Sequence, residues 1–266
     1  QPPSGPQAGE VSMVKKVCKE LIAECVRRGY ARKGETLSRC IGDAVYQNIT
    51  LAATEFRGGE TTRIPVIKIG FWSMYSSLPA FYFDERQRVG LFFPENLVGR
   101  RFVGGDHSLE NECGIMLSSG LDLLDSLTTQ KQVVEYSRAF RLLQEGQEQE
   151  YCSDLCAPLV LCGDYDRARE ILQSIYVRSC LAFHRRNDRL RDMGRCREYV
   201  DAELLFEQEE LCGMSRKELK DFMVNVISKN DDGLNEYFDL CLKRNIRCAK
   251  VNKIAFSKYF SPNGMP

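Results

Sequence analysis

The sequence predicts an α+β protein, in which an N-terminal helix and an antiparallel sheet precede a helical bundle. Three observations support this prediction. Residues 63–93 contain two runs rich in β-branched and aromatic residues, the types that suit a pleated surface. Short glycine-containing turns separate the strand-like runs, and turns of this length join antiparallel strands. From Leu109 onwards the apolar residues recur every three or four positions, which is the period of a helix.

The first expected element is an amphipathic helix over Met13–Arg28. Ser12 is a suitable N-cap, and Gly29 ends the helix. Cys18 and Cys25 lie seven positions apart on its apolar stripe, so we interpret both as small core residues. Residues 1–12 are rich in proline and glycine and are expected to form a flexible tail.

The expected sheet is a meander of about four or five strands. Residues 36–41 and Ala44–Phe56 supply two of them, and residues 63–93 supply the others. In this last stretch Ile67, Ile69 and Phe71 share one face, and the polar run at residues 85–88 predicts a hairpin turn.

Helical periodicity then continues almost to the end of the chain. Around Gly163 the sequence is similar to the inter-helix turn of tetratricopeptide-type hairpins, but stacked repeats need about three such units. We therefore expect one helical hairpin within a bundle, and three parts in all: a tail over 1–12, an α+β domain over 13–104 and a helical domain over 105–266. The expected helices are Leu109–Leu127, Thr129–Gln144, Tyr151–Cys162, Tyr165–Arg185, one after the capping-box pattern Ser215–Glu218 and one from Asp231; Val251–Phe260 is a short strand or helix.

Composition excludes several classes of partner. The 266 residues contain 37 Lys+Arg and 37 Asp+Glu, so net charge favours neither nucleic acid nor an anionic membrane. No apolar run approaches the ~18 residues of a membrane span, and no signal-peptide pattern is present. The 12 cysteines are spread along the chain, so we expect reduced, mostly buried thiols and a cytoplasmic protein.

No standard catalytic or nucleotide-binding motif occurs in the sequence. One arrangement could still support an enzyme, because His107 could serve as a base toward Cys113 while Asp106 orients it. The same residues have a structural interpretation, since Asp106 could cap the helix that follows. We expect the structural role.

Three cysteines could suggest zinc: Cys152, Cys156 and Cys162. Their spacing lacks the paired knuckles that are typical of zinc sites. Cys152 and Cys156 are one helical turn apart, as core neighbours would be, so we expect buried thiols and no cofactor.

A strongly charged stretch follows His184, with arginines first and carboxylates after them. A solvated helical face with pairs four residues apart is the simpler interpretation. If the chain binds a protein, charge complementarity would give speed and specificity, and the expected contact residues lie here. They are Arg189, Arg191, Glu207 and Glu209.

The run Gly29–Gly34 (Gly-Tyr-Ala-Arg-Lys-Gly), with the preceding helix and the following strands, resembles an uncharacterised bacterial α+β family. The resemblance covers about residues 13–95. Members of that type occur beside polymorphic toxins and are suspected immunity proteins. The resemblance implies a non-catalytic protein that neutralises a toxin by binding it, and it transfers no catalytic residue. The alternatives are an enzyme at His107 and Cys113, or an adaptor built on the helical part.

Overall fold

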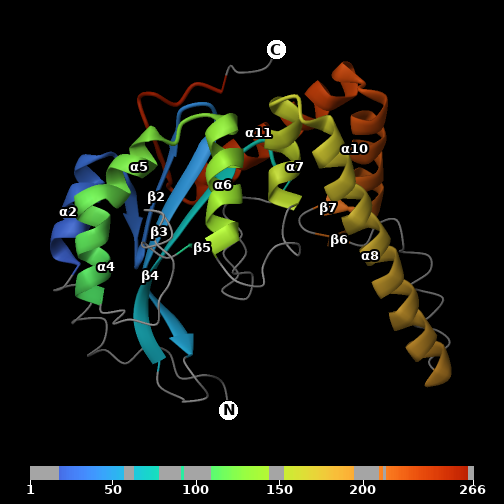
Figure 1. The fold of residues 1–266 in the computed structure, drawn as a ribbon, viewed down its shortest axis with the longest axis horizontal. Coiled ribbons are helices and arrows are strands. Elements are labelled where there is room, and N and C mark those ends of the chain that lie inside the picture. Colours follow the sequence, from blue (N-terminus) through green and yellow to red (C-terminus); the bar gives the residue numbers. More distant parts are fainter. Residues whose placement is uncertain are drawn as a thin grey trace. The chain divides into compact units, whose positions relative to one another are not determined.

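The computed structural model describes residues 18–56, 63–77, 91–92, 109–143, 153–194, 210–211 and 214–262 (Figure 1). These residues belong to two units. The first draws on Gln1–Trp72, Phe83–Glu150 and Ala249–Gly264, and the second on Ser73–Tyr82 and Tyr151–Cys248. The predicted boundary after residue 104 lies outside the described residues.

The first unit is built on the predicted antiparallel sheet, whose strands follow the order β1-β2-β3-β4-β5. Residues Thr36 to Ile41 pair with Thr50 to Val45 across a tight turn, so the meander is confirmed here. The predicted turn at residues 85–88 lies outside the described residues, and β5 pairs with the middle of β4. The strands are β1 (Ala31–Lys33), β2 (Thr36–Ile41), β3 (Val45–Phe56), β4 (Arg63–Ser73) and β5 (Leu91–Phe92).

One strand departs from the antiparallel pattern. The predicted short element near the C-terminus is β8 (Ala255–Phe256), which pairs in parallel with Arg39 and Cys40 of β2. Because β1 covers only the first half of the outer edge of β2, the second half is open for β8. A returning chain thereby protects an edge that would otherwise present unpaired backbone groups.

The N-terminal helix is confirmed as α2 (Lys19–Arg27), and the predicted Ser12 cap lies outside the described residues. Its end is set by Gly29, whose φ of 86° is left-handed. The amide of Gly29 donates to the carbonyl of Val26, and the amide of Tyr30 donates to that of Cys25. These two bonds form a Schellman motif, which satisfies two helix-terminal carbonyls.

The predicted helix from Leu109 is also confirmed, but a π-helical turn interrupts it in the middle. It comprises α4 (Leu109–Ile115), the π-helical turn η1 (Met116–Gly120) and α5 (Leu121–Ser126), and is followed by α6 (Gln130–Leu143). A Cβ added to Gly120 would lie 2.7 Å from the sulfur of Met116, so a larger residue there would require the Met116 side chain to move. Gly120, which interrupts the apolar pattern of the helix predicted over Leu109–Leu127, is the last residue of this local π turn.

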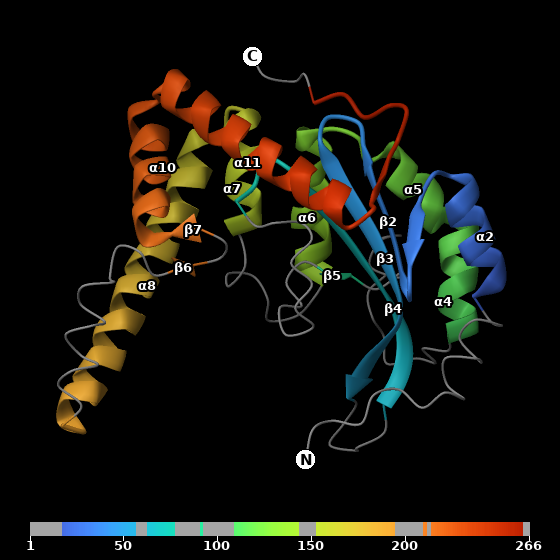
Figure 2. The same ribbon diagram turned by 180° about the vertical axis from the view of Figure 1, so that it is seen from behind.

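Helices α2, α4 and α5 lie on the same side of the sheet in both views (Figure 1, Figure 2). Ile67, Ile69 and Phe71 are buried, as predicted. Lys68 and Trp72, which alternate with them, are also at least nine-tenths buried. Strand β4 therefore has buried side chains on both of its faces in the first unit.

The second unit is a helical bundle in which α7 and α10 pack against α8. Asp164 caps α8 by accepting from the amide of Arg167, and Ser215 and Glu218 form the predicted capping box at the start of α10. None of the described helices combines the length and apolar character needed to cross a membrane. The elements are α7 (Ser153–Leu161), α8 (Tyr165–Asp192), β6 (Glu210–Leu211), β7 (Met214–Ser215), α10 (Arg216–Ser228) and α11 (Asp231–Val251), of which the last turn belongs to the first unit.

Two sequence-based details of this unit are wrong. Helix α8 extends seven residues beyond the predicted end at Arg185, and Asn187 continues its buried stripe one turn beyond Phe183. In the helix after the capping box, the apolar spacing predicts that both Val226 and Ile227 face inward, but Ile227 is about half exposed. It lies next to the buried Val226, and only one of two adjacent helical positions can point to the core here.

Candidate functional site

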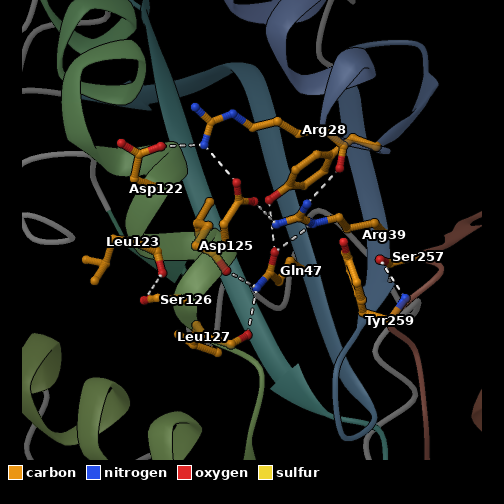
Figure 3. Close-up of polar contacts among 12 residues, drawn as sticks. Arg28, Arg39, Gln47, Asp122, Leu123, Asp125, Ser126, Leu127, Ser257 and Tyr259 are labelled. Carbon is orange, nitrogen blue, oxygen red and sulfur yellow. Dashed lines mark hydrogen bonds and ion pairs between the residues drawn. The ribbon is translucent and has the colours of Figure 1, made fainter.

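Three places in the described residues concentrate chemistry: a polar cluster on the sheet, a pair of thiols and the outer face of α8. The polar cluster is centred on Arg39 of β2 and Gln47 of β3, which are directly opposed in the sheet register. Both side chains are at least 98% buried. Nε of Arg39 and the hydroxyl of Tyr30 both donate to Oε1 of Gln47, over 3.0 Å and 2.9 Å (Figure 3).

The same two side chains bind the ends of the helices that cover the sheet. Nε2 of Gln47 donates to the carbonyls of Leu124 and Leu127 at the end of α5, over 2.6 Å and 3.0 Å. Nη1 of Arg39 donates to the carbonyl of Arg28 at the end of α2, over 2.7 Å. The last carbonyls of a helix lack the full set of partners within it, and the sheet supplies donors to these three, although the Leu124 carbonyl also accepts from the amide of Leu127.

Ion pairs extend the cluster to its exposed rim. Asp125 on α5 accepts from Nη2 of Arg39 over 2.5 Å and from Nη1 of Arg28 over 2.8 Å, and Nη1 of Arg28 also bonds Asp122 (Figure 3). Nε of Arg28 bonds Glu24 on its own helix over 2.7 Å. The guanidinium of Arg39 lies 4.2 Å from the centre of the Tyr30 ring. Burial raises the pKa of Tyr30, so its hydroxyl remains a donor. Every donor described here has a protein acceptor, and we assign the cluster a structural role.

The thiol pair involves Cys113, one residue of the predicted enzyme site. Cys113 lies on α4 and is 5% exposed, and its sulfur is 3.1 Å from that of Cys18, which is fully buried. The other two residues of that site, Asp106 and His107, lie outside the described residues. The described neighbour of the Cys113 sulfur is therefore a second thiol.

The pKa values of the two thiols are shifted in opposite directions. A hydrogen bond from the Cys113 thiol lowers the pKa of Cys18, against the opposing effects of burial and of Glu35, Glu110 and Glu112. The same hydrogen bond raises the pKa of Cys113, and burial adds to it. Glu112 is itself fully buried, and its carboxylate accepts from the backbone amide of Ile67 over 2.5 Å.

The cysteines considered for zinc are separated by the fold. Cys156 is buried, as predicted, whereas Cys162 is exposed. The expectation of a buried thiol is wrong for Cys162 because α7 ends at Leu161 and the chain turns into solvent at Gly163. Cys152 lies outside the described residues, and no group of three or more potential ligands within the described ranges could hold a metal ion.

The predicted contact residues are only partly described. Arg189 is exposed on α8, and Arg191 belongs to the same helix. Glu207 and Glu209 lie outside the described residues. On the outer face of α8, Val177 and Leu181 are 54% and 51% exposed and lie one helical turn apart. The same helix carries exposed arginines, Arg178, Arg185, Arg186 and Arg189, of which Arg186 lies 5.2 Å from the ring centre of the inward-facing Phe183.

A pocket of about 400 Å³ also lies in the second unit. It is lined by the turn between α7 and α8 and by the first turns of α11, including the buried Leu234 and Phe238 and the exposed Asp231. The amine of Lys229 lies 5.4 Å from the centre of the Tyr165 ring, which lines the same pocket. We assign this pocket no ligand.

Sequence reasoning did not find the Arg39–Gln47 cluster, although a signal was present. A three-residue turn at residues 42–44 places Arg39 and Gln47 opposite each other on the two strands that it joins. Cys18 and Cys113 gave no comparable signal, because 95 positions separate them and only the packing of α2 near η1 brings them together.

No family model, curated protein or solved structure matches this chain.

Proposed function

We propose that this chain is a non-catalytic protein-binding protein, and that the outer face of α8 is its contact surface. The observation that carries the proposal is the exposure of Val177 and Leu181 beside a set of arginines. Protein interfaces combine large apolar anchors with arginine, which covers apolar surface with its stem and binds carboxylates with its head group. The partner should therefore carry an apolar patch bordered by acidic residues.

The inner face of α8 holds this surface in place. Phe183 is buried between helices, and the buried guanidinium of Arg216 on α10 lies 5.0 Å from its ring centre. Nη2 of Arg216 also donates to the carbonyl of Ser179 over 3.2 Å. A rigid helix loses little conformational freedom on binding, which favours affinity.

The resemblance of residues 13–95 suggests the kind of partner. Immunity proteins act by binding and blocking a toxin, and a charged surface of this kind speeds recognition through charge complementarity. We propose that the partner is a bacterial toxin and that this chain neutralises it.

The test is a matched set of variants used for affinity capture from the source organism. Val177→Asp with Leu181→Asp places two charges on the proposed surface. Val26→Asp is the control, because Val26 is 52% exposed on α2 in the other unit. We expect the wild type and the control to retain the same partner. When that partner has been purified, its affinity for the double variant should be at least about tenfold lower than for the wild type, which corresponds to about 1.4 kcal/mol in binding free energy.

Co-expression then tests neutralisation. The captured partner alone should arrest growth, and the wild type and Val26→Asp should relieve the arrest while the double variant does not. Circular dichroism must show that the double variant remains folded. Equal affinity of the double variant and the wild type would refute the proposed surface, and a partner that is harmless when expressed alone would refute the toxin role.

A further inference from the structure

We propose that Cys18 and Cys113 form a dithiol that hydrogen peroxide converts to a disulfide, which links the start of α2 to α4. The inference rests on their geometry. Their sulfur atoms are 3.1 Å apart, although 95 positions separate the two residues in the sequence. A disulfide has a sulfur–sulfur distance of about 2.05 Å, so bond formation requires a further approach of about 1 Å.

The other buried thiols described in this unit differ from this pair. Burial raises the pKa of Cys25 and of Cys40 to about 12, so both remain protonated at neutral pH. Cys18 instead accepts a hydrogen bond from the Cys113 thiol, which favours its thiolate. Since the thiolate is the nucleophile, oxidation should start at this pair.

The chemistry balances in two steps. First, the Cys18 thiolate attacks one oxygen of hydrogen peroxide and the O–O bond breaks, which gives a sulfenic acid on Cys18 and a hydroxide ion that takes up a proton to become water. Next, the Cys113 sulfur attacks the Cys18 sulfur, loses its proton and displaces a second water. The two sulfurs together lose two electrons, and the peroxide gains them.

The position of the pair gives the disulfide a structural effect. Cys18 is the N-cap residue of α2 and makes no side-chain capping bond to that helix, whereas Cys113 lies in the middle of α4. A covalent link across 95 positions restricts the unfolded chain, and the restriction grows with loop length. The oxidised protein should therefore unfold at a higher temperature, by about 5 °C or more.

The experiment treats the full chain under native conditions with a small excess of hydrogen peroxide. Free thiols are then alkylated, and the non-reduced digest is mapped by mass spectrometry. We expect a peptide pair joined through Cys18 and Cys113, and a rise in the thermal midpoint of Trp72 fluorescence that dithiothreitol reverses. The result that overturns the proposal is alkylation of both residues after treatment that has already oxidised the exposed Cys162.

Variants separate this pair from general oxidation. Cys18→Ser and Cys113→Ser should each abolish the rise in thermal midpoint, whereas Cys162→Ser should leave it unchanged. The peptide map of the wild type needs no variant, so the proposal stays testable if a serine at either buried position prevents folding. Loss of the rise in Cys162→Ser, with the Cys18–Cys113 peptide pair absent, would contradict the assignment. The result is independent of α8 and its partner.

Discussion

Arg39 and Gln47 lie opposite each other on neighbouring strands, and together they supply hydrogen-bond donors to the C-terminal ends of two helices. Arg39 donates to the carbonyl of Arg28, the C-cap residue of α2, and Gln47 donates to two carbonyls at the end of α5. Helix ends usually find partners in their own flanking residues or in water. Here one pair of sheet residues fixes the position of both helices, so their packing depends on two polar side chains.

Replacing Gln47 should therefore destabilise the first unit strongly. Gln47→Leu removes the acceptor for Tyr30 and Arg39 and leaves the Leu124 and Leu127 carbonyls without that donor in a buried site. We expect a loss of about 2–4 kcal/mol in the free energy of unfolding. Urea denaturation followed by Trp72, the single tryptophan, measures it.

The control is Gln173→Leu, which makes the same chemical change at an exposed position of α8. Its effect should stay within about 0.5 kcal/mol. If the two variants were equally stable, the cluster would not position the helices as we infer.

Gly42 offers a test of how the β2–β3 turn contacts the helical layer. Its φ is 56°, and an added Cβ would lie 2.2 Å from the carbonyl oxygen of Thr128, to which the amide of Asp43 donates a hydrogen bond. Gly34 has a similar φ of 60° with open space around it. Gly34→Ala should lower the free energy of unfolding by about 1–2 kcal/mol through backbone strain alone.

Gly42→Ala should cost more, about 3–5 kcal/mol, because the clash with Thr128 adds to the same strain. Denaturation curves of the two variants, recorded side by side, give the difference. Equal losses for the two would mean that the turn does not contact Thr128.

Glu24 should contribute to the acid sensitivity of α2. Hydrogen bonds from Arg27 and Arg28 lower its pKa from 4.5 to about 2. A carboxyl group with a lowered pKa in the folded state stabilises the protein above its unfolded pKa, and that contribution is lost as the pH falls from about 4.5 to about 2. The stability difference between the wild type and Glu24→Gln should therefore shrink over this range.

The measurement is the urea midpoint of both proteins from pH 6 to pH 2.5. Glu20→Gln is the matched control, since it removes the same charge from the same helix. A difference between the wild type and Glu24→Gln that stays constant down to pH 2.5 would contradict the expected titration. Because Glu24 is only partly buried and its partner Arg27 is exposed, the effect should be small and should weaken in high salt.

Much of this fold could be predicted from the sequence because local chemistry determines it. The capping box at Ser215 and Glu218 and the helix stop at Gly29 both act within a few residues, and both are confirmed. The pairing of β8 with β2 and the contact of Cys18 with Cys113 depend on how distant segments pack. No local pattern encodes such contacts. The predicted contact residues on α8 stay a prediction, because function depends on a partner.

Gly70 provides the last test, since its lack of a side chain makes room for Trp72. An added Cβ would lie 2.2 Å from the indole of Trp72, which stacks on Tyr46 with ring centres 5.7 Å apart. In Gly70→Ala the indole must leave this buried site, so its fluorescence should shift to longer wavelength and stability should fall by about 1–3 kcal/mol. Gly114→Ala is the control and should raise the stability instead. Gly114 lies within α4 with open space around it, and alanine favours a helix over glycine by about 0.5–1 kcal/mol. An unchanged emission maximum in Gly70→Ala would show that the indole does not lie across Gly70.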